Sequence, residues 1–288
     1  MFKFILVPAA GIETDGLVFA SALQVARLWS SHLEFLHVRA DVQKIVVNMA
    51  AGDFVGGTGL DQIIDSLDQE TTATENKAEA AVREFCTREQ IEIGGRPNAK
   101  HPTAEWRVKT GDAPELIVAH GRAADLLVVG RAHKGDTLAV EVLEASLMGT
   151  GRPLLIPSAA PLRVDGGTVV IAWKDTREAG RAVAAAMPFI RRAAKVIILS
   201  VEEDARSTQT SCDRLCRAIC WHNPATLVRH LQQDGRAPVE TMLEGAAVAG
   251  ADLLVMGGYG HSRVREVFFG GFTRRVLTSD TLPVLMAH

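Results

Sequence analysis

The sequence lacks the features that mark membrane proteins and nucleic-acid-binding proteins. No apolar run approaches the roughly 18 residues that a membrane-spanning helix needs. Charge of one sign is not in excess, because 31 Lys and Arg stand against 34 Asp and Glu for a net charge of −3. Both signs are interspersed, so the chain has no electrostatic footprint for nucleic acid. The apolar fraction of 47% is that of an ordinary globular protein.

Signals for secretion and for common catalytic centres are also missing. The N-terminus, MFKFILVPAAG, holds a short apolar stretch that Pro8 interrupts, so we expect a first β-strand rather than a signal peptide. Four cysteines do not make a disulfide framework, and the protein is expected to be cytoplasmic. There is no GxSxG, HExxH or Walker-type loop, so we predict no catalytic residue and no metal ligand.

An internal repeat spans the 288 residues, a length that suits two domains of about 140 residues each. The repeat pairs apolar runs of the first half with runs of the second half, in the same order: 4–10 with 169–175, 32–38 with 195–201, 123–130 with 250–257, and 151–157 with 281–287. A proline- and glycine-bearing stretch, 158–167, separates the halves. We therefore predict two domains, residues 1–160 and 164–288.

Short apolar runs alternate with segments of helical period in each half. Residues 175–193 predict a helix with Asp175 or Thr176 as its N-cap, and residues 236–250 predict another. The strands are near-continuous apolar runs, which indicates a parallel sheet covered on both faces. The alternation predicts an α/β doubly wound fold in each half.

The first half carries an extra stretch, residues 41–75, with a glycine-rich loop at 52–59 and a long helix from near Asp61. We expect a surface excursion, and a lid or partner surface is the alternative.

Three cysteines of the second half, Cys212, Cys216 and Cys220, recur every four residues and share one face of a predicted helix. Each step of four turns about 40° around the helix, and the full span exceeds the reach of one ion. His222 points elsewhere. We expect buried small apolar side chains, with a metal or redox role as the alternative.

Glycine gathers at both ends of GGYGHSRVREVFFGG, residues 257–271. The first glycines follow the apolar run 251–256 and therefore lie at the carboxyl end of a parallel strand, where ligands bind in open sheets. Their N–H groups can form an anion nest, and Gly270 and Gly271 precede a helix whose N-terminus can bind phosphate. A tight turn with a plain helix entry is the alternative, and physical reasoning alone favours neither.

The spacing Gly257-x2-Gly260-x9-Gly270, followed by a small residue and Thr273, resembles the signature of the universal stress protein family. The stretches AWKDTREAGRAV and GADLLVMGGYGHSRVREVFFGG look like bacterial tandem members of that family. The resemblance implies two tandem five-stranded, Rossmann-like α/β domains, frequent dimerisation and, in one subclass, ATP binding.

The resemblance also implies a nucleotide site in the second half, formed by Ala172, Trp173, Lys174, Val201, Met256, Gly257, Tyr259, Gly260, His261, Gly270, Gly271, Phe272 and Thr273. Val201 matches the apolar position beside adenine, whereas the glycines and Thr273 match positions for ribose and phosphates. Lys174 departs from the pattern because it stands where an aspartate is usual, and Gly271 departs because it replaces a serine. Loss of one hydroxyl costs on the order of 1 kcal/mol. Trp173 could serve only in packing, and His261 could simply face solvent.

The first half looks degenerate beside the second. Ala10 stands where the aspartate would be, and the stretch from Arg131 lacks the second glycine. Arg131, His133 and Lys134 could hold an anion, but a solvated basic loop is the preferred interpretation. This half is expected to form an internal pseudo-dimer with the second.

Together these features predict a stress-response regulator that binds ATP or another adenine nucleotide, with or without Mg²⁺, and that can form a homodimer. The alternative is a ligand-free scaffold that acts through dimerisation and protein–protein contacts. Slow ATP hydrolysis is a third hypothesis, and it is the weakest because no residue set for phosphoryl transfer is recognisable.

Overall fold

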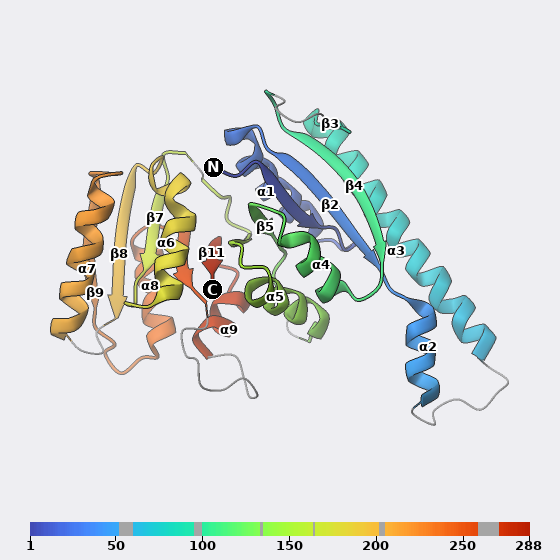
Figure 1. Ribbon diagram of the computed structural model, residues 1–288. Helices are drawn as coiled ribbons and strands as arrows, with labels where there is room; N and C mark the ends of the chain where they lie inside the picture. Colours follow the sequence, from blue (N-terminus) through green and yellow to red (C-terminus); the bar gives the residue numbers. More distant parts are fainter. Residues whose placement is uncertain (52–59, 95–99, 133–134, 164, 202–204, 259–270) are drawn as a thin grey trace.

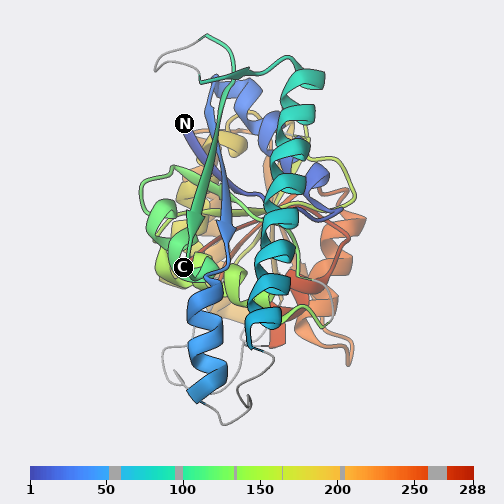
Figure 2. The ribbon, with the colours of Figure 1, turned by 90° about the vertical axis from the view of Figure 1, so that its right-hand side faces the viewer.

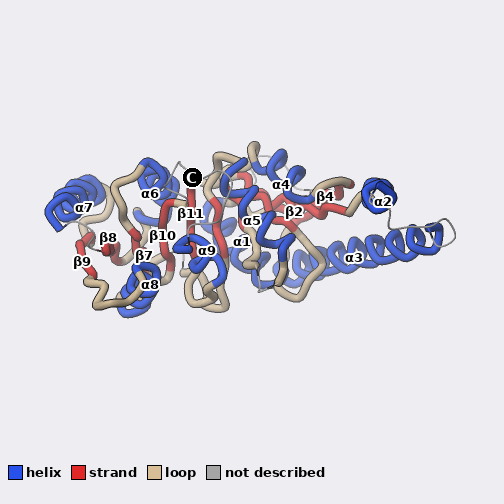
Figure 3. The backbone as a smooth tube through the Cα atoms, turned by 90° about the horizontal axis from the view of Figure 1, so that it is seen from below, coloured by secondary structure: helices blue, strands red, loops and turns tan. Residues whose placement is uncertain are grey.

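The computed structural model describes residues 1–51, 60–94, 100–132, 135–163, 165–201, 205–258 and 271–288. Their backbone forms one long twisted sheet with helices on both sides (Figures 1 and 3). Among these residues no helix is long and apolar enough to cross a membrane.

Eleven strands make up the sheet, in the order β3-β4-β2-β1-β5-β6-β11-β10-β7-β8-β9. The strands are β1 (Phe4–Pro8), β2 (His32–Arg39), β3 (Glu92–Ile93), β4 (Thr103–Thr110), β5 (Leu126–Val128), β6 (Leu154–Ile156), β7 (Thr168–Ala172), β8 (Lys195–Val201), β9 (Thr226–Leu231), β10 (Leu253–Gly257) and β11 (Val284–Ala287).

Strand order is the same in the two halves, because β6-β5-β1-β2-β4 corresponds to β11-β10-β7-β8-β9. The predicted doubly wound parallel fold is thereby confirmed for both halves. Two features were not foreseen. The short strand β3 extends the first half at its edge, and β6 pairs antiparallel with β11, so that two sheets become one.

Helices cover both sides of this sheet (Figure 3). They are α1 (Asp15–Trp29), α2 (Val42–Ala51), α3 (Leu60–Glu89), α4 (Ala113–Gly121), α5 (Thr137–Gly149), α6 (Arg177–Ile190), α7 (Ala205–Cys220), α8 (Pro238–Val248) and α9 (Gly271–Thr278). The helices predicted at 175–193 and 236–250 are α6 and α8. Asp112 and Asp136 begin α4 and α5 by accepting hydrogen bonds from backbone N–H groups of the first turn.

The core consists of two apolar clusters, each of which draws residues from both halves. The α6-side cluster includes buried residues of α1, α3, α6 and α7. The α9-side cluster includes buried residues of α4, α5, α8 and α9. Since both clusters continue from one half into the other, the halves share their core.

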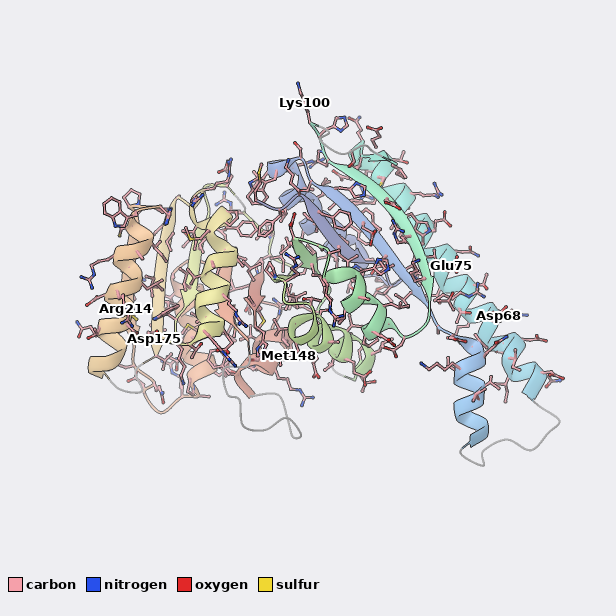
Figure 4. All side chains as sticks on the ribbon, viewed as in Figure 1. Asp68, Glu75, Lys100, Met148, Asp175 and Arg214 are labelled. Carbon is pink, nitrogen blue, oxygen red and sulfur yellow. The ribbon has the colours of Figure 1, made fainter. Side chains whose placement is uncertain are left out.

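The extra stretch of the first half forms two helices that project beyond the sheet (Figures 1 and 2). They are α2 and the first part of α3, a helix of 30 residues. Arg39, the last residue of β2, fastens α3 there, because its guanidinium lies 2.7 Å from a carboxylate oxygen of Asp68 and 3.6 Å from one of Glu75. Figure 4 labels both acidic residues on α3. The excursion is therefore helical and anchored.

Three aromatic side chains, the aromatic trio, join the two halves on the α6 side of the sheet. Phe2 and Trp29 of the first half pack against Phe189 of α6, with ring centroids 5.4 to 5.5 Å apart in all three pairs. Edge-to-face aromatic pairs contribute about 0.5–1.5 kcal/mol each beyond their burial.

Arg131 joins the two halves by hydrogen bonds on the α9 side of the sheet. Its guanidinium, 6% exposed, donates hydrogen bonds to the carbonyl oxygens of Pro157 at 2.7 Å, Val276 at 2.8 Å and Leu282. Burial lowers the pKa of Arg131 to about 10, although the carboxylate of Asp280, 3.6 Å away, opposes this shift. The side chain therefore stays charged at neutral pH. The expectation of a solvated basic loop is wrong for Arg131, and His133 and Lys134 lie outside the described residues.

Replacement of Arg131 by methionine is expected to lower the free energy of unfolding by about 2–4 kcal/mol, because buried carbonyl oxygens lose their donor. Urea denaturation monitored by circular dichroism measures the change. The matched control is Arg152→Met, since Arg152 is exposed and donates to a single carbonyl, that of Arg122. We expect less than about 0.5 kcal/mol for the control. Equal midpoints for both variants would contradict a sealing role for Arg131.

Candidate functional site

The second half reverses its strand order between β7 and β10. The chain runs from β7 outward through β8 and β9, and then returns to the other side of β7 as β10. At their carboxyl ends Ala172 of β7 pairs with Met256 of β10. A reversal of this kind opens a crevice where doubly wound folds bind ligands. The carboxyl ends of β7 and β10, which the sequence predicts to be near a ligand, therefore lie side by side at this reversal.

Gly257, the last residue of β10, lies directly against the start of α6. A Cβ atom built on Gly257 would lie 2.5 Å from the backbone nitrogen of Ala179 and 2.7 Å from the carbonyl carbon of Glu178. Real Cβ atoms do not approach backbone this closely, so the position requires glycine. The N-terminus of α6 thus lies directly at the switch point.

The N-terminus of α6 already holds an anion. Thr176 caps the helix by accepting a hydrogen bond from the N–H of Ala179 at 3.3 Å. Glu178 is 3% exposed, and its carboxylate accepts a hydrogen bond of 2.5 Å from Arg177. Burial alone would raise the pKa of Glu178, but hydrogen bonds from Arg177, its own N–H and Thr176 hold it below its ordinary value. A charged carboxylate therefore occupies the positive end of this helix.

The N-terminus of α9 differs in composition. Its first four residues, Gly271 to Arg274, include no carboxylate, and Thr273 is buried there. The helix docks on α8 through an ion pair of 2.6 Å between Arg275 and Glu240. Figure 1 shows α9 at the end of the sheet toward which the β8 arrow points. A helix N-terminus without its own acidic residue can accept an external anion.

Several of the predicted site residues lie on one side of the sheet. Met256 belongs to the α9-side cluster, and Ala172, Val201 and Phe272 pack against it. Trp173 packs instead against the α6-side cluster, and its indole N–H donates to Ser211 of α7 at 3.3 Å.

Lys174 follows β7 and is exposed. Gly271 has open space around the position of a Cβ atom. Four further predicted residues lie outside the described part of the chain: Tyr259, Gly260, His261 and Gly270.

Two features of the loop after β7 were not foreseen in full. Thr176, rather than Asp175, caps α6, and the carboxylate of Asp175 pairs with Arg214 of α7 at 2.7 Å (Figure 4). The role of Glu178 was missed altogether. Its position two residues after a threonine cap was the available signal, because acidic residues favour the first turn of a helix.

The first half closes the corresponding loop with its own chain. Gly11 has a φ of 78°, and a Cβ atom there would lie 2.8 Å from the carbonyl oxygen of Thr74 in α3. The N–H of Gly11 donates to the carboxylate of Asp15 at 2.7 Å. Burial raises the pKa of Asp15, against hydrogen bonds that include this one. The loop after β1 is therefore covered by α3.

Comparison with known proteins agrees with the fold. The family model described as Universal stress protein family matches residues 220–288. The chain is similar over 99% of its length to 96% of a universal stress protein from Archaeoglobus fulgidus DSM 4304, at 18% identity and a TM-score of 0.73. A functionally unknown protein from Pseudomonas aeruginosa PAO1 is similar over 99% of this chain and 92% of that chain, at 14% identity and a TM-score of 0.55.

A universal stress protein in complex with cAMP is similar over 54% of this chain and 96% of that chain, at 15% identity. Its TM-score of 0.30 is too low for its ligand to bear on this site. No curated protein sequence matches the chain.

Substitution Gly257→Ala is expected to destabilise the protein by about 1–3 kcal/mol, because the added methyl group meets backbone atoms of α6. Thermal unfolding followed by circular dichroism measures the effect. Gly271→Ala is the matched control, since a methyl group there meets open space, and we expect a change within about 0.5 kcal/mol. An unchanged midpoint for Gly257→Ala would show that the β10–α6 contact is looser than described.

Proposed function

We propose that the chain is a universal stress protein whose second half binds an adenine nucleotide, foremost ATP, because the family model matches residues 220–288 and the whole chain shares its fold with a universal stress protein. The ligand would lie across the carboxyl ends of β7 and β10, with its phosphates at the N-terminus of α9. We further propose the domain limits 1–160 and 164–288.

One observation carries the position of the phosphates, namely the contrast between the two helix N-termini. The first turn of α6 holds the buried carboxylate of Glu178, which would repel a phosphate. The first turn of α9 holds Gly271, Thr273 and Arg274 with no acidic residue. Phosphate is stabilised by free N–H groups, by a hydroxyl and by the positive end of a helix dipole. Only the α9 end of this pair meets these conditions.

The remaining residues are proposed to contact different parts of the ligand, namely the base, the ribose and the phosphates. Ala172, Val201 and Met256 supply an apolar wall suited to the adenine base. Gly257 is a proposed ribose contact through its backbone, since the position of its missing Cβ is filled by α6. Lys174 replaces a carboxylate with a cation at the end of β7 and is expected to face the phosphates. Tyr259, Gly260, His261 and Gly270 stay predicted contacts.

The described residues do not fit a protein-held Mg²⁺ at this site. Of the two carboxylates that follow β7 most closely, Asp175 pairs with Arg214 and Glu178 with Arg177. Mg²⁺ prefers oxygen ligands and commonly retains several waters with the phosphates of a nucleotide. Any Mg²⁺ would therefore arrive with ATP and be held by it.

The proposed role is regulatory rather than catalytic. A nucleotide that binds one conformation better than another shifts the population toward it, by as much as the two affinities differ. Partners would read the surface so stabilised as a stress signal. The competing function is a ligand-free scaffold, which Lys174 and Gly271 favour because both depart from the ATP-binding pattern.

Isothermal titration of nucleotide-stripped protein with ATP separates the two functions, and Thr273→Val localises the ligand. We expect binding that weakens several-fold in the variant, because one phosphate hydrogen bond of about 1 kcal/mol is lost while side-chain volume is kept. Thr278→Val, on the same helix, is the control, since Thr278 is exposed and its hydroxyl donates, among the described residues, to carbonyl oxygens of its own helix. No heat with ATP, ADP or AMP would favour the scaffold.

Lys174→Met tests the replaced charge. If the ammonium group faces the phosphates, the variant loses affinity for ATP by roughly tenfold but keeps its affinity for adenosine, which carries no phosphate. Competition of both ligands against a fluorescent ATP analogue measures the two affinities in one assay. Equal losses for ATP and adenosine would place Lys174 away from the phosphates.

A further inference from the structure

Two thiol groups meet near the C-terminal end of α7, on the opposite side of the sheet from α8. The Sγ atoms of Cys216 and Cys220 lie 4.0 Å apart, and both side chains are half-buried. The Cys216 sulfur also lies 3.9 Å from the carbonyl oxygen of Thr226, the first residue of the edge strand β9. The pair is therefore reachable at the seam between α7 and the edge of the sheet.

This spacing does not suit a disulfide. Residues four apart on a helix have Cβ atoms about 5–6 Å apart, whereas a disulfide needs about 3.5–4.5 Å. Closing the bond would require the last turns of α7 to distort. An ion with two ligands binds them on opposite sides, so bonds of about 2.3 Å would place two sulfurs roughly 4.6 Å apart. The observed separation of 4.0 Å is within reach of that value by small rotations of the two side chains.

A four-coordinate zinc site does not fit either. Within the described part of the chain, no group of three His, Cys, Asp or Glu side chains could hold a metal ion. Cys212, one turn earlier, is fully buried, and its thiol hydrogen bonds with Ser200 and Ser211. The sulfurs of Cys216 and Cys220 remain as ligands, and two ligands suit a metal ion that accepts a low coordination number.

We propose that Cys216 and Cys220 form a two-coordinate site for a monovalent thiophilic ion, Cu(I). Soft thiolate ligands select Cu(I) over harder ions such as Mg²⁺. The site is separate from the proposed nucleotide site, which lies at the strand ends.

Binding exchanges protons for the metal without any change of oxidation state. Burial raises the pKa of the Cys216 thiol, and the hydrogen bond and charge of Cys220 raise it further. Cys216 is therefore protonated at neutral pH. One Cu⁺ ion replaces the S–H protons with two Cu–S bonds, and two protons pass to the buffer.

The experiment titrates reduced, metal-free, full-length protein with Cu(I) under nitrogen, in competition with a chromophoric Cu(I) chelator. We expect one Cu(I) per chain. Cys216→Ser and Cys220→Ser should each weaken binding by at least tenfold. Cys86→Ser is the control and should bind as the parent does, because Cys86 is buried in α3 of the first half.

Three results would overturn the site. They are failure of the parent protein to take Cu(I) from the chelator, undiminished binding in both single variants, and a loss in Cys212→Ser as large as in Cys216→Ser. Circular dichroism of each variant checks that α7 is intact. Trp221, 90% exposed and adjacent to Cys220, gives a second readout, since bound Cu(I) should quench its fluorescence in the parent but not in Cys220→Ser.

Discussion

The antiparallel contact of β6 with β11 is the constraint on which the rest of the architecture depends. Each half by itself would end in an exposed edge strand, and unpaired edges attract other chains. Pairing Leu155 with Leu285 removes both edges at once and brings the two cores together. Arg131 and the aromatic trio then act on either side of this pairing. The internal repeat therefore supplies a partner within the chain for the surface that each half leaves open.

The two halves differ most at the loop that follows their first strand. In the first half, Gly11 and Asp15 draw the loop after β1 tightly beneath α3, and α3 extends outward with α2. In the second half the corresponding loop is joined to α7 by the Asp175–Arg214 ion pair, which is exposed to solvent and screened by it. In the first half the loop after the first strand is thus covered by a helix that projects beyond the sheet, whereas in the second half the corresponding loop is linked to α7.

Local sequence predicted the elements well and their long-range partners poorly. The runs at 4–10 and 195–201 contain β1 and β8, because buried parallel strands need continuous apolar residues. The pairing of β6 with β11 has no such signal, since it joins segments far apart in the chain through backbone atoms. Arg131 was misjudged for the same reason: its acceptors are carbonyl oxygens, which every residue carries. In the candidate site, the strand ends and the start of α9 were predictable from the glycine spacing. The negative charge at the start of α6 could be recognised only from the structure, which shows that Glu178 is buried.

Helix α9 connects these conclusions, because different parts of the protein hold its two ends. The guanidinium of Arg131 donates hydrogen bonds to the carbonyl oxygens of Val276 and Leu277 in its last turn, so the first half fixes that end. Its first turn contains Gly271 and Thr273, where we place the phosphates. A short helix moves largely as a unit, since its backbone hydrogen bonds resist bending. If the proposed nucleotide displaces the first turn of α9, the displacement would therefore reach the Arg131 contact through the helix.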